Sequence, residues 1–280
     1  MTKIYNQAPL PFQGQKRNWN GLFKAALKKE FADCNVFIDL FGGSGLLSRM
    51  VKDVRPDSVV FYNDFDDYHK RIAAVEQTNA LLAQLRQLLG DYPRGKLINE
   101  PLKTAVLALI KRADEQGFVD YITLSSSLLF SMNYATNYEQ FCKQALYNTI
   151  RKNDYDDASD YLDGIEIVKL DYKELFAKWR DFPNVCFLID PPYLSTDAQT
   201  YTGYWKLKDY LDVLHTLKNT NYFYFTSNKS SIVELCEWLE QNSAAHNPFH
   251  GATKKEIVSR MTHNSSYVDI MLFKQRLNGV

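Results

Sequence analysis

Short apolar runs alternate with amphipathic helical patterns at both ends of the chain. Each apolar run is typical of a buried strand. In chain order the strand-like runs are "NVFIDLF", "DSVVFYND", "IEIVKL", "VCFLID", "NYFYFTS", the less regular "EIVSR", and "YVDIMLF". Helical patterns cover residues 19–32, 46–54, 67–89 and 172–180. This order of strand, turn, helix and strand predicts a parallel, doubly wound α/β sheet.

The strand pattern stops between about residues 90 and 160, where the chain becomes helical. The segment "PLKTAVLALIKRADEQG" predicts a helix, because Pro101 suits its first turn and Gly117 its end. Residues 119–131 and 137–152 also follow helical patterns. We therefore predict an α/β core that carries an inserted helical module. The predicted boundaries are residues 1–89 and 165–280 for the core and residues 90–164 for the insertion.

Composition places the chain among ordinary globular proteins, with 45% hydrophobic and 24% charged residues. The 33 basic and 33 acidic side chains cancel to a net charge of zero, which argues against a strongly basic nucleic-acid-binding protein. Two segments are nevertheless basic, "QKRNWNGLFKAALKK" and "HNPFHGATKKEIVSRMTH". Residues 153–166 are acidic and are expected to face away from any phosphate.

The four cysteines are widely spaced and form no C-x-x-C pair, which is typical of reduced thiols. The chain opens without a signal-peptide pattern, and no uninterrupted apolar run is long enough to span a bilayer. We therefore expect a soluble cytoplasmic protein.

A glycine-rich turn follows the strand in "FIDLFGGSG" and precedes a helical pattern. Gly42, Gly43 and Gly45 permit positive φ angles and close approach of a ligand, and the helix N-terminus offers free N–H groups to an anion. Asp64 ends the next strand nineteen positions after Gly45, where a carboxylate can accept hydrogen bonds from ribose hydroxyls. Asp171, at the end of a third strand, can accept from an adenine amine. The pattern favours an adenosine-containing ligand, and the lack of a Walker lysine leaves a dinucleotide or S-adenosylmethionine.

A fourth strand ends in "DPPY", which suits chemistry on a planar amine. The amine of adenine or cytosine is a poor nucleophile because its lone pair is conjugated into the ring. Two acceptors for its two N–H groups would release that lone pair, and Asp190 and the Pro191 carbonyl supply them. Proline also fixes φ and donates no hydrogen bond. Tyr193 offers a ring on which the base can stack while the amine attacks a methyl sulfonium in line.

These motifs, in this order, resemble those of the Dam-type adenine-specific DNA methyltransferases of the alpha group, which are DPPY amino-methyltransferases. The resemblance rests on "PFQGQKRNW", "DLFGGSG", "YND", "LDY", "DPPY" with the following "TYTGYW", and "FTSN". The helical insertion lies where the alpha group places its target-recognition domain. The resemblance implies a Rossmann-like sheet with an antiparallel last strand, S-adenosylmethionine as methyl donor and S-adenosylhomocysteine as product. It also implies an adenine flipped out of double-stranded DNA.

The resemblance further assigns roles to individual residues. The catalytic candidates are Asp190, Pro191, Pro192 and Tyr193. The cofactor-binding candidates are Phe12, Gly14, Lys16, Asp39, Phe41, Gly42, Gly43, Ser44, Gly45, Asp64, Phe65, Asp171, Tyr172 and Asp190.

Contacts with DNA are expected from the insertion, from the loop after "DPPY" and from the basic segments. The candidates are Asn133, Tyr134, Asn137, Tyr201, Lys254 and Lys255. Asparagine can read adenine through two hydrogen bonds. A helix-breaking loop capped by asparagine is an equally good interpretation of "SMNYATNY".

No metal ion is expected, because methyl transfer needs none. His246 and His250 are separated by Pro248, which breaks a helical face, and no Cys or acid joins them. The expected partner is double-stranded DNA, and a cognate restriction endonuclease is a second candidate partner. A monomer is favoured.

Two other functions stay open from the residues alone. The first is methyl transfer to another planar amine, which includes cytosine in DNA, adenine in RNA or a protein glutamine. The second is a non-catalytic DNA-binding regulator that kept the fold. The N-terminal motif and the position of the insertion favour adenine in DNA, and the intact "DPPY" with Asp64 and Gly42 argues against a decayed copy.

Overall fold

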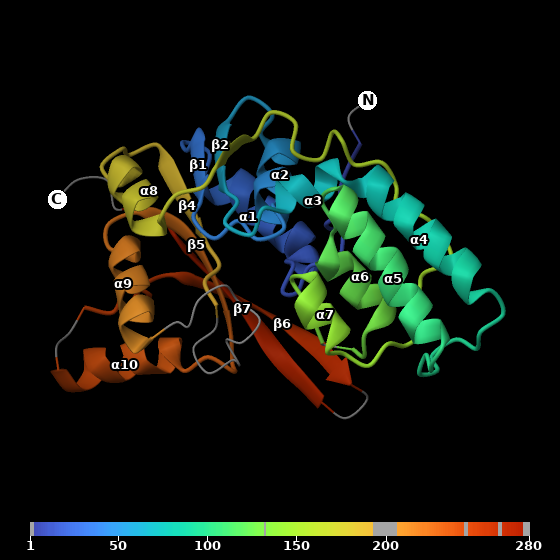
Figure 1. Ribbon diagram of the computed structural model, residues 1–280. Helices are drawn as coiled ribbons and strands as arrows, with labels where there is room; N and C mark the ends of the chain where they lie inside the picture. Colours follow the sequence, from blue (N-terminus) through green and yellow to red (C-terminus); the bar gives the residue numbers. More distant parts are fainter. Residues whose placement is uncertain (1–2, 132, 193–205, 244–245, 263–264, 277–280) are drawn as a thin grey trace. The chain divides into compact units, whose positions relative to one another are not determined.

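The computed structural model divides the chain between two units (Figure 1). The sheet unit contains residues 16–66 and 164–280, and the helical unit contains residues 1–15 and 67–163. The structure describes residues 3–131, 133–192, 206–243, 246–262 and 265–276. Residues 1–15 and 67–89, which the sequence assigns to the core, are grouped with the helical unit. The functional boundary between a catalytic core and a recognition module stays a prediction.

Within the described residues, the sheet unit is built on a seven-stranded sheet with the order β3-β2-β1-β4-β5-β7-β6. Its strands are β1 (Val36–Asp39), β2 (Val59–Asn63), β3 (Glu166–Val168), β4 (Val185–Ile189), β5 (Asn221–Ser227), β6 (Thr253–Thr262) and β7 (Ser265–Lys274). The first five strands run parallel, and β7 runs antiparallel between β5 and β6. The predicted Rossmann-like α/β fold, with its antiparallel last strand, is therefore confirmed.

Helical segments of the sheet unit alternate with its strands along the chain. They are the 3-10 helix η1 (Arg17–Trp19) and the α-helices α1 (Asn20–Glu30), α2 (Leu46–Val54), α8 (Tyr172–Trp179), α9 (Leu207–Leu217) and α10 (Ile232–Ser243). The predicted helices at residues 19–32, 46–54 and 172–180 are confirmed as α1, α2 and α8. Helices α9 and α10 are additional to the prediction, although "LKDYLDVLHTL" carries apolar residues at helical spacing.

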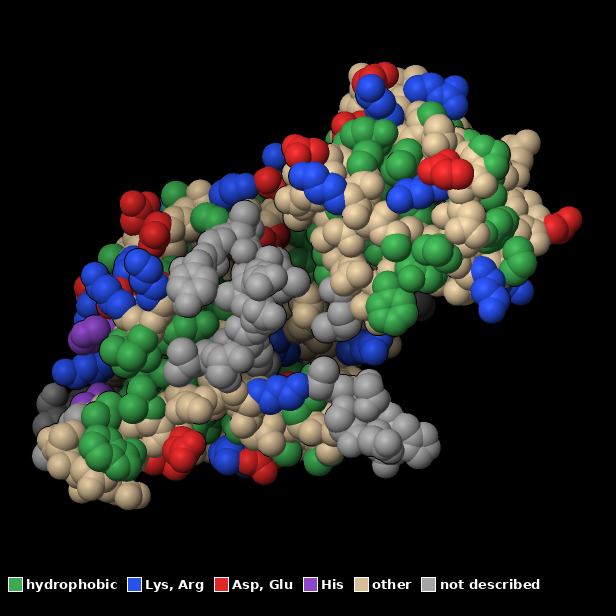
Figure 2. Space-filling view, turned by 60° about the horizontal axis from the view of Figure 1, so that its bottom comes forward, with side chains coloured by type: hydrophobic (Ala, Val, Ile, Leu, Met, Phe, Trp, Pro, Cys, Tyr) green, Lys and Arg blue, Asp and Glu red, His purple; other side chains and the backbone are tan. Residues whose placement is uncertain are grey.

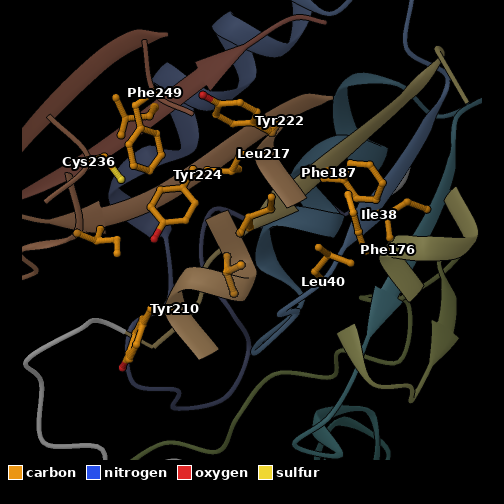
Figure 3. Close-up of a cluster of buried hydrophobic side chains, with 14 of the residues drawn as sticks. Ile38, Leu40, Phe176, Phe187, Tyr210, Leu217, Tyr222, Tyr224, Cys236 and Phe249 are labelled. Carbon is orange, nitrogen blue, oxygen red and sulfur yellow. The ribbon is translucent and has the colours of Figure 1, made fainter. Parts of the chain in front are cut away.

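Alternate side chains of β5 enter two separate apolar layers, because successive residues of a strand face opposite sides of a sheet. Phe223 and Phe225 contact α1, where the ring centroid of Phe23 lies 4.8 Å from that of Phe223. Tyr222 and Tyr224 join a buried cluster on the other face with residues of α8, α9 and α10 (Figure 3). Coverage on both faces explains why the central strands form continuous apolar runs in the sequence.

The helical unit has an apolar core of its own. Its helices are α3 (Tyr68–Ala73), α4 (Val75–Leu89), α5 (Leu102–Gln116), α6 (Tyr121–Leu128) and α7 (Tyr138–Cys142). Buried side chains from α4 to α7 form one cluster, which includes Leu82, Leu85, Ile110, Leu124 and Phe141. The helix predicted from Pro101 to Gly117 is confirmed as α5, and the helical pattern at residues 67–89 forms two consecutive helices.

The predicted helix at residues 137–152 is wrong beyond the short helix α7. The chain after α7 instead pairs with the segment before α5. The Ile98 N–H donates to the Leu146 carbonyl at 2.7 Å, and the Asn148 N–H donates to the Lys96 carbonyl at 3.0 Å. These bonds use backbone groups that a helix would pair internally, so tertiary pairing overrides the local pattern.

Two side chains of α3 hold the opening segment of the chain in the helical unit. The Tyr68 hydroxyl accepts from the Leu10 N–H at 3.1 Å and donates to the Leu10 carbonyl at 3.2 Å. The Arg71 guanidinium donates to the Pro11 carbonyl at 2.7 Å. The Phe12 ring packs edge-on against Tyr68, with 5.8 Å between the ring centroids. These contacts explain why the opening segment groups with the helices.

The turn between β1 and α2 requires glycine for two different reasons. Gly43 and Gly45 have φ angles of 51° and 69°, in the left-handed region that favours glycine. At Gly42 an added Cβ would lie 2.1 Å from Cε2 of Tyr62. The Tyr62 hydroxyl donates to the Gly43 carbonyl at 2.7 Å, which fixes the ring over the turn. Packing within the protein therefore requires glycine at this position, whether or not a ligand binds.

Gly42→Ala should destabilise the fold, because the new methyl group overlaps the Tyr62 ring. We expect the unfolding free energy to fall by about 1–3 kcal/mol, measured by urea-induced unfolding. Gly21→Ala is a matched control, because Gly21 is exposed in α1 and has nothing within 4 Å of an added Cβ. That control should gain about 0.5–1 kcal/mol. Wild-type stability of Gly42→Ala would contradict the packing argument.

Candidate active site

Four aspartates lie at the carboxyl ends of neighbouring parallel strands in the sheet unit. In sheet order, from β3 to β2, β1 and β4, they are Asp171, Asp64, Asp39 and Asp190. Ligands of open α/β sheets bind beyond this edge, because the carboxyl ends of parallel strands point the same way. The sequence predicts each acid separately, and the structure brings their backbone positions to one edge of the sheet.

Asp190 forms an ion pair with Lys16, between Asp190 Oδ2 and Lys16 Nζ. Both side chains are largely buried, with exposed fractions of 9% for Lys16 and 19% for Asp190. Burial raises the pKa of Asp190, and the charge of Lys16 opposes that rise. Lys16 Nζ also lies 6.0 Å from the ring centroid of Phe225. The sequence predicts Lys16 as a cofactor residue and gives no signal of its contact with the predicted catalytic acid.

Asp39 is fully buried at the end of β1. The Ser48 hydroxyl donates to Asp39 Oδ2 at 2.8 Å from the first turns of α2, a contact that the sequence does not predict. Among the described residues, no donor forms a hydrogen bond of good geometry with Asp39 Oδ1. The backbone N–H of Phe41 nevertheless favours the charged form of the Asp39 carboxyl. Burial raises the pKa of Asp39 to about 7, and the neighbouring charge of Asp190 adds to the rise. The Ser48 hydrogen bond and the Lys16 charge act in the opposite direction.

Asp64 is held at the edge by its backbone. The residue is 1% exposed, and its N–H donates to the Val168 carbonyl at 2.8 Å. The following Phe65 is 55% exposed, and its ring centroid lies 5.8 Å from Lys169 Nζ. A buried acid beside an exposed ring offers hydrogen-bond acceptors and an aromatic surface, which suits a nucleoside.

Asp171 has a structural role that the sequence does not predict. Its Oδ1 accepts a hydrogen bond from the Lys173 N–H at 2.7 Å and caps the N-terminus of α8. The adjacent Tyr172 packs against Phe41, with 5.0 Å between the ring centroids. Burial raises the pKa of Tyr172 above its ordinary value, so the phenol stays protonated. The structure therefore brings three predicted cofactor residues, Phe41, Asp171 and Tyr172, into one region.

The remaining predicted residues of the sheet unit lie in its turns. Ser44 is buried in the turn between β1 and α2. Pro191 is buried and Pro192 is half-buried after β4. Tyr193 and Tyr201 lie outside the described residues.

The predicted residues of the helical unit have different surroundings. Gly14 has a φ angle of 82°, in the left-handed region. Asn133 is exposed, and Tyr134 is half-buried with a pKa that burial raises. Asn137 caps α7 by accepting from the Gln140 N–H at 2.9 Å, which matches the capping interpretation of this segment. DNA contacts by these residues stay predictions.

Lys254 and Lys255 lie on the edge strand β6, where Lys254 pairs with Glu256. Blue Lys and Arg side chains are interspersed with red Asp and Glu side chains on the face shown in Figure 2, in keeping with the zero net charge. Within the described residues, no group of three or more His, Cys, Asp or Glu side chains could hold a metal ion. In the same part of the chain, no helix is both long and apolar enough to cross a membrane.

Asp39→Asn should change how stability depends on pH. The folded protein holds the Asp39 proton up to a pKa of about 7, whereas the ordinary value is 3.8. The unfolded chain therefore releases this proton first, and the unfolding free energy of the wild type falls as pH rises between those values. Relative to wild type, Asp39→Asn should gain on the order of 2 kcal/mol from about pH 5 to about pH 8. Urea unfolding at both pH values measures this, and a difference that is independent of pH would contradict the raised pKa.

Comparisons with known proteins identify the family of this chain. The family model of the D12 class N6 adenine-specific DNA methyltransferases matches residues 12–231. A protein of Haemophilus influenzae, named "Putative methyltransferase", is 30% identical to this chain over 283 residues, which cover 97% of this chain and 93% of the relative. The family match includes all four strand-end aspartates and Lys16. The chain therefore belongs to the D12 class of N6 adenine-specific DNA methyltransferases, enzymes that methylate adenine in DNA.

Proposed function

We propose that this enzyme transfers the methyl group of S-adenosylmethionine to the exocyclic amine of an adenine that is extruded from the DNA duplex. One observation carries the proposal. A largely buried carboxylate, that of Asp190, follows β4 at the shared strand edge, contacts Lys16 and precedes two prolines.

The extruded amine needs two acceptors in fixed positions. The Asp190 carboxylate accepts one N–H and the Pro191 carbonyl accepts the other, which draws the nitrogen lone pair out of the ring. Pro191 has no N–H of its own, and because Pro192 follows it, the ψ angle that directs the Pro191 carbonyl is restricted. The amine gains positive charge as it is methylated and loses one of its two protons toward the carboxylate. Positioning and charge stabilisation supply most of the catalysis.

Lys16 keeps Asp190 in its acceptor form. Burial raises the pKa of Asp190, and a protonated carboxyl would be a weaker acceptor. The Lys16 ammonium lowers that pKa and so favours the ionised state near neutral pH. A carboxylate has two oxygens with about four acceptor sites, so it can hold Lys16 and the amine together. Methyl transfer is expected to weaken when pH falls below the pKa of Asp190.

The acids at the strand edge fit the methyl donor. S-adenosylmethionine supplies an electrophilic methyl group on a sulfonium cation. The negative carboxylates of Asp39 and Asp190 would attract this sulfonium cation. The cation would in turn stabilise the ionised forms of both acids. Asp64 is proposed to accept from the ribose hydroxyls and Asp171 from the adenine amine. The turn at Gly43 and Gly45 leads into the N-terminus of α2, where free N–H groups can bind an anionic part of a ligand. The first turn of α2 carries no acidic side chain that would repel such a group.

Extrusion of the base follows from the position of the target amine. Adenine N6 lies inside the duplex, and extruding its base costs a few kcal/mol, an amount that DNA contacts must offset. The proposed contacts are those of Asn133, Tyr134, Asn137, Lys254 and Lys255. A cognate restriction endonuclease and a monomeric state stay predictions.

Asp190→Asn should abolish most methyl transfer. An amide cannot accept hydrogen bonds on both terminal atoms and carries no charge, so we expect kcat to fall at least about 100-fold. Asp53→Asn is the matched control, because Asp53 is also a largely buried acid and pairs at 2.9 Å with both Lys24 and Arg49, near the end of α2. The control should lose stability and keep transfer.

Both variants are assayed with methyl-labelled donor and DNA of mixed sequence, followed by nucleoside analysis and mapping of the modified positions. The wild type should yield N6-methyladenine at defined sites. Near-normal turnover by Asp190→Asn would refute the proposed mechanism. Modification of cytosine instead of adenine would refute the proposed acceptor.

Asp64→Ala should weaken donor binding. The carboxylate is proposed to bond the ribose, and loss of hydrogen bonds to a charged group costs about 1.5–3 kcal/mol, which is roughly a tenfold or larger rise in the Kd for S-adenosylmethionine. Calorimetric titration of the purified variant measures that Kd. An unchanged Kd would refute the assignment of Asp64 to the ribose.

A further inference from the structure

The side chain of Asn63 connects the carboxyl ends of three strands, β1, β2 and β3, through hydrogen bonds. It is buried, with 2% of the residue exposed, at the end of β2. Its Nδ2 donates to the Leu40 carbonyl at 3.1 Å and to the Leu170 carbonyl at 3.0 Å. Its Oδ1 accepts from the Leu170 N–H at 3.0 Å. Both N–H groups and the carbonyl of the amide are therefore used.

Each backbone position that Asn63 fixes stands next to a predicted cofactor residue. Leu40 precedes Phe41, and Leu170 precedes Asp171. Asn63 itself precedes Asp64. The amide thus fixes the backbone next to Phe41, Asp64 and Asp171, which lie in three different segments of the chain.

The hydrogen bonds of the Asn63 side chain lie where the backbone pairing of β2 with β3 ends. The ladder of β2 with β3 finishes at the pair of Asn63 with Val168, and β3 is a short strand at the edge of the sheet. Leu170 lies beyond that last pair, so the Asn63 amide extends the connection past the end of the strand. A buried amide can do this because it combines donors and an acceptor in one plane.

We propose that Asn63 is a positioning residue for the methyl donor: it holds Phe41, Asp64 and Asp171 in register for the adenosine portion without touching the ligand. This inference rests on the proposed function of the same edge. Aspartate at this position would set a carboxylate against the two carbonyl oxygens that Nδ2 now bonds. Donor affinity, rather than the rate of the chemical step, should therefore depend on the Asn63 amide.

Asn221 provides a control of the same chemistry in the same sheet. It is 6% exposed, and its Nδ2 donates to the carbonyls of Pro183 and Val185, each at 2.9 Å. Its Oδ1 accepts from the Arg276 N–H at 2.8 Å. Asn221 begins β5, which places it at the amino ends of the parallel strands. The two asparagines make the same three kinds of hydrogen bond, Asn63 at the carboxyl ends of the parallel strands and Asn221 at their amino ends.

The test compares Asn63→Asp with Asn221→Asp in the full chain. Both variants should lower the midpoint of urea unfolding, because each removes an amide donor that bonds two buried carbonyls. Only Asn63→Asp should raise the Kd for S-adenosylmethionine and for S-adenosylhomocysteine, by about tenfold or more. Its kcat at saturating donor should stay within about threefold of wild type, so that the loss falls on KM for the donor.

Asn63→Ala is the second variant, for the case in which the aspartate variant does not fold. It removes the three bonds without adding charge and should show the same selective loss of donor affinity. Wild-type donor affinity in the folded Asn63 variants would overturn the inference. An equal loss of affinity in Asn221→Asp would also overturn it, because the effect would then follow from stability alone.

Asp64→Ala separates failure of this inference from failure of the proposed function. Weaker donor binding in Asp64→Ala with unchanged binding in the Asn63 variants refutes the positioning role and leaves the proposed donor site intact. Wild-type protein that does not bind S-adenosylmethionine refutes both. Unchanged binding in Asp64→Ala together with weak binding in Asn63→Asp supports the positioning role and refutes only the ribose contact.

Discussion

Parallel pairing of four neighbouring strands is the constraint on which the candidate site depends. Because β3, β2, β1 and β4 run in one direction, the residues that follow them share one edge of the sheet. The apolar interior of the strands fixes this pairing, since helices cover both faces and leave the strand ends as the place where polar groups can gather. The acids of the site are therefore a consequence of the same packing that forms the core.

Burial of Asp39 and Asp190 opposes the stability that the core provides. Asp39 is inaccessible to solvent and carries a pKa of about 7, which means that its ionised form is unfavourable in the folded protein. Lys16 and Ser48 offset part of this cost through an ion pair with Asp190 and a hydrogen bond to Asp39. The carboxyl ends of β1 and β4 thus carry two neighbouring acids whose pKa values burial raises, a property that is common in catalytic sites.

The sequence predicts the strands, the turn after β1 and the acids that follow the strands, because these depend on local patterns of apolar residues, glycine and aspartate. Tertiary contacts explain most of what it does not predict. The chain around Leu146 pairs with the segment at Ile98 instead of continuing a helix, and no local pattern records that pairing. The contact of Lys16 with Asp190 and the bonds of Asn63 likewise join stretches that are distant in sequence. Periodicity does indicate α9, whose apolar residues follow helical spacing.

The crowding of Gly42 by Tyr62 has an evolutionary consequence. Selection on folding alone would keep glycine at this position, so a descendant that had lost its ligand would still display the glycine of a nucleotide-binding turn. Asp39 behaves in the opposite way, because relaxed selection would favour its replacement by an uncharged residue that suits a buried position. If Asp39 serves the methyl donor as proposed, the buried aspartate is a better marker of a working enzyme among related sequences than Gly42.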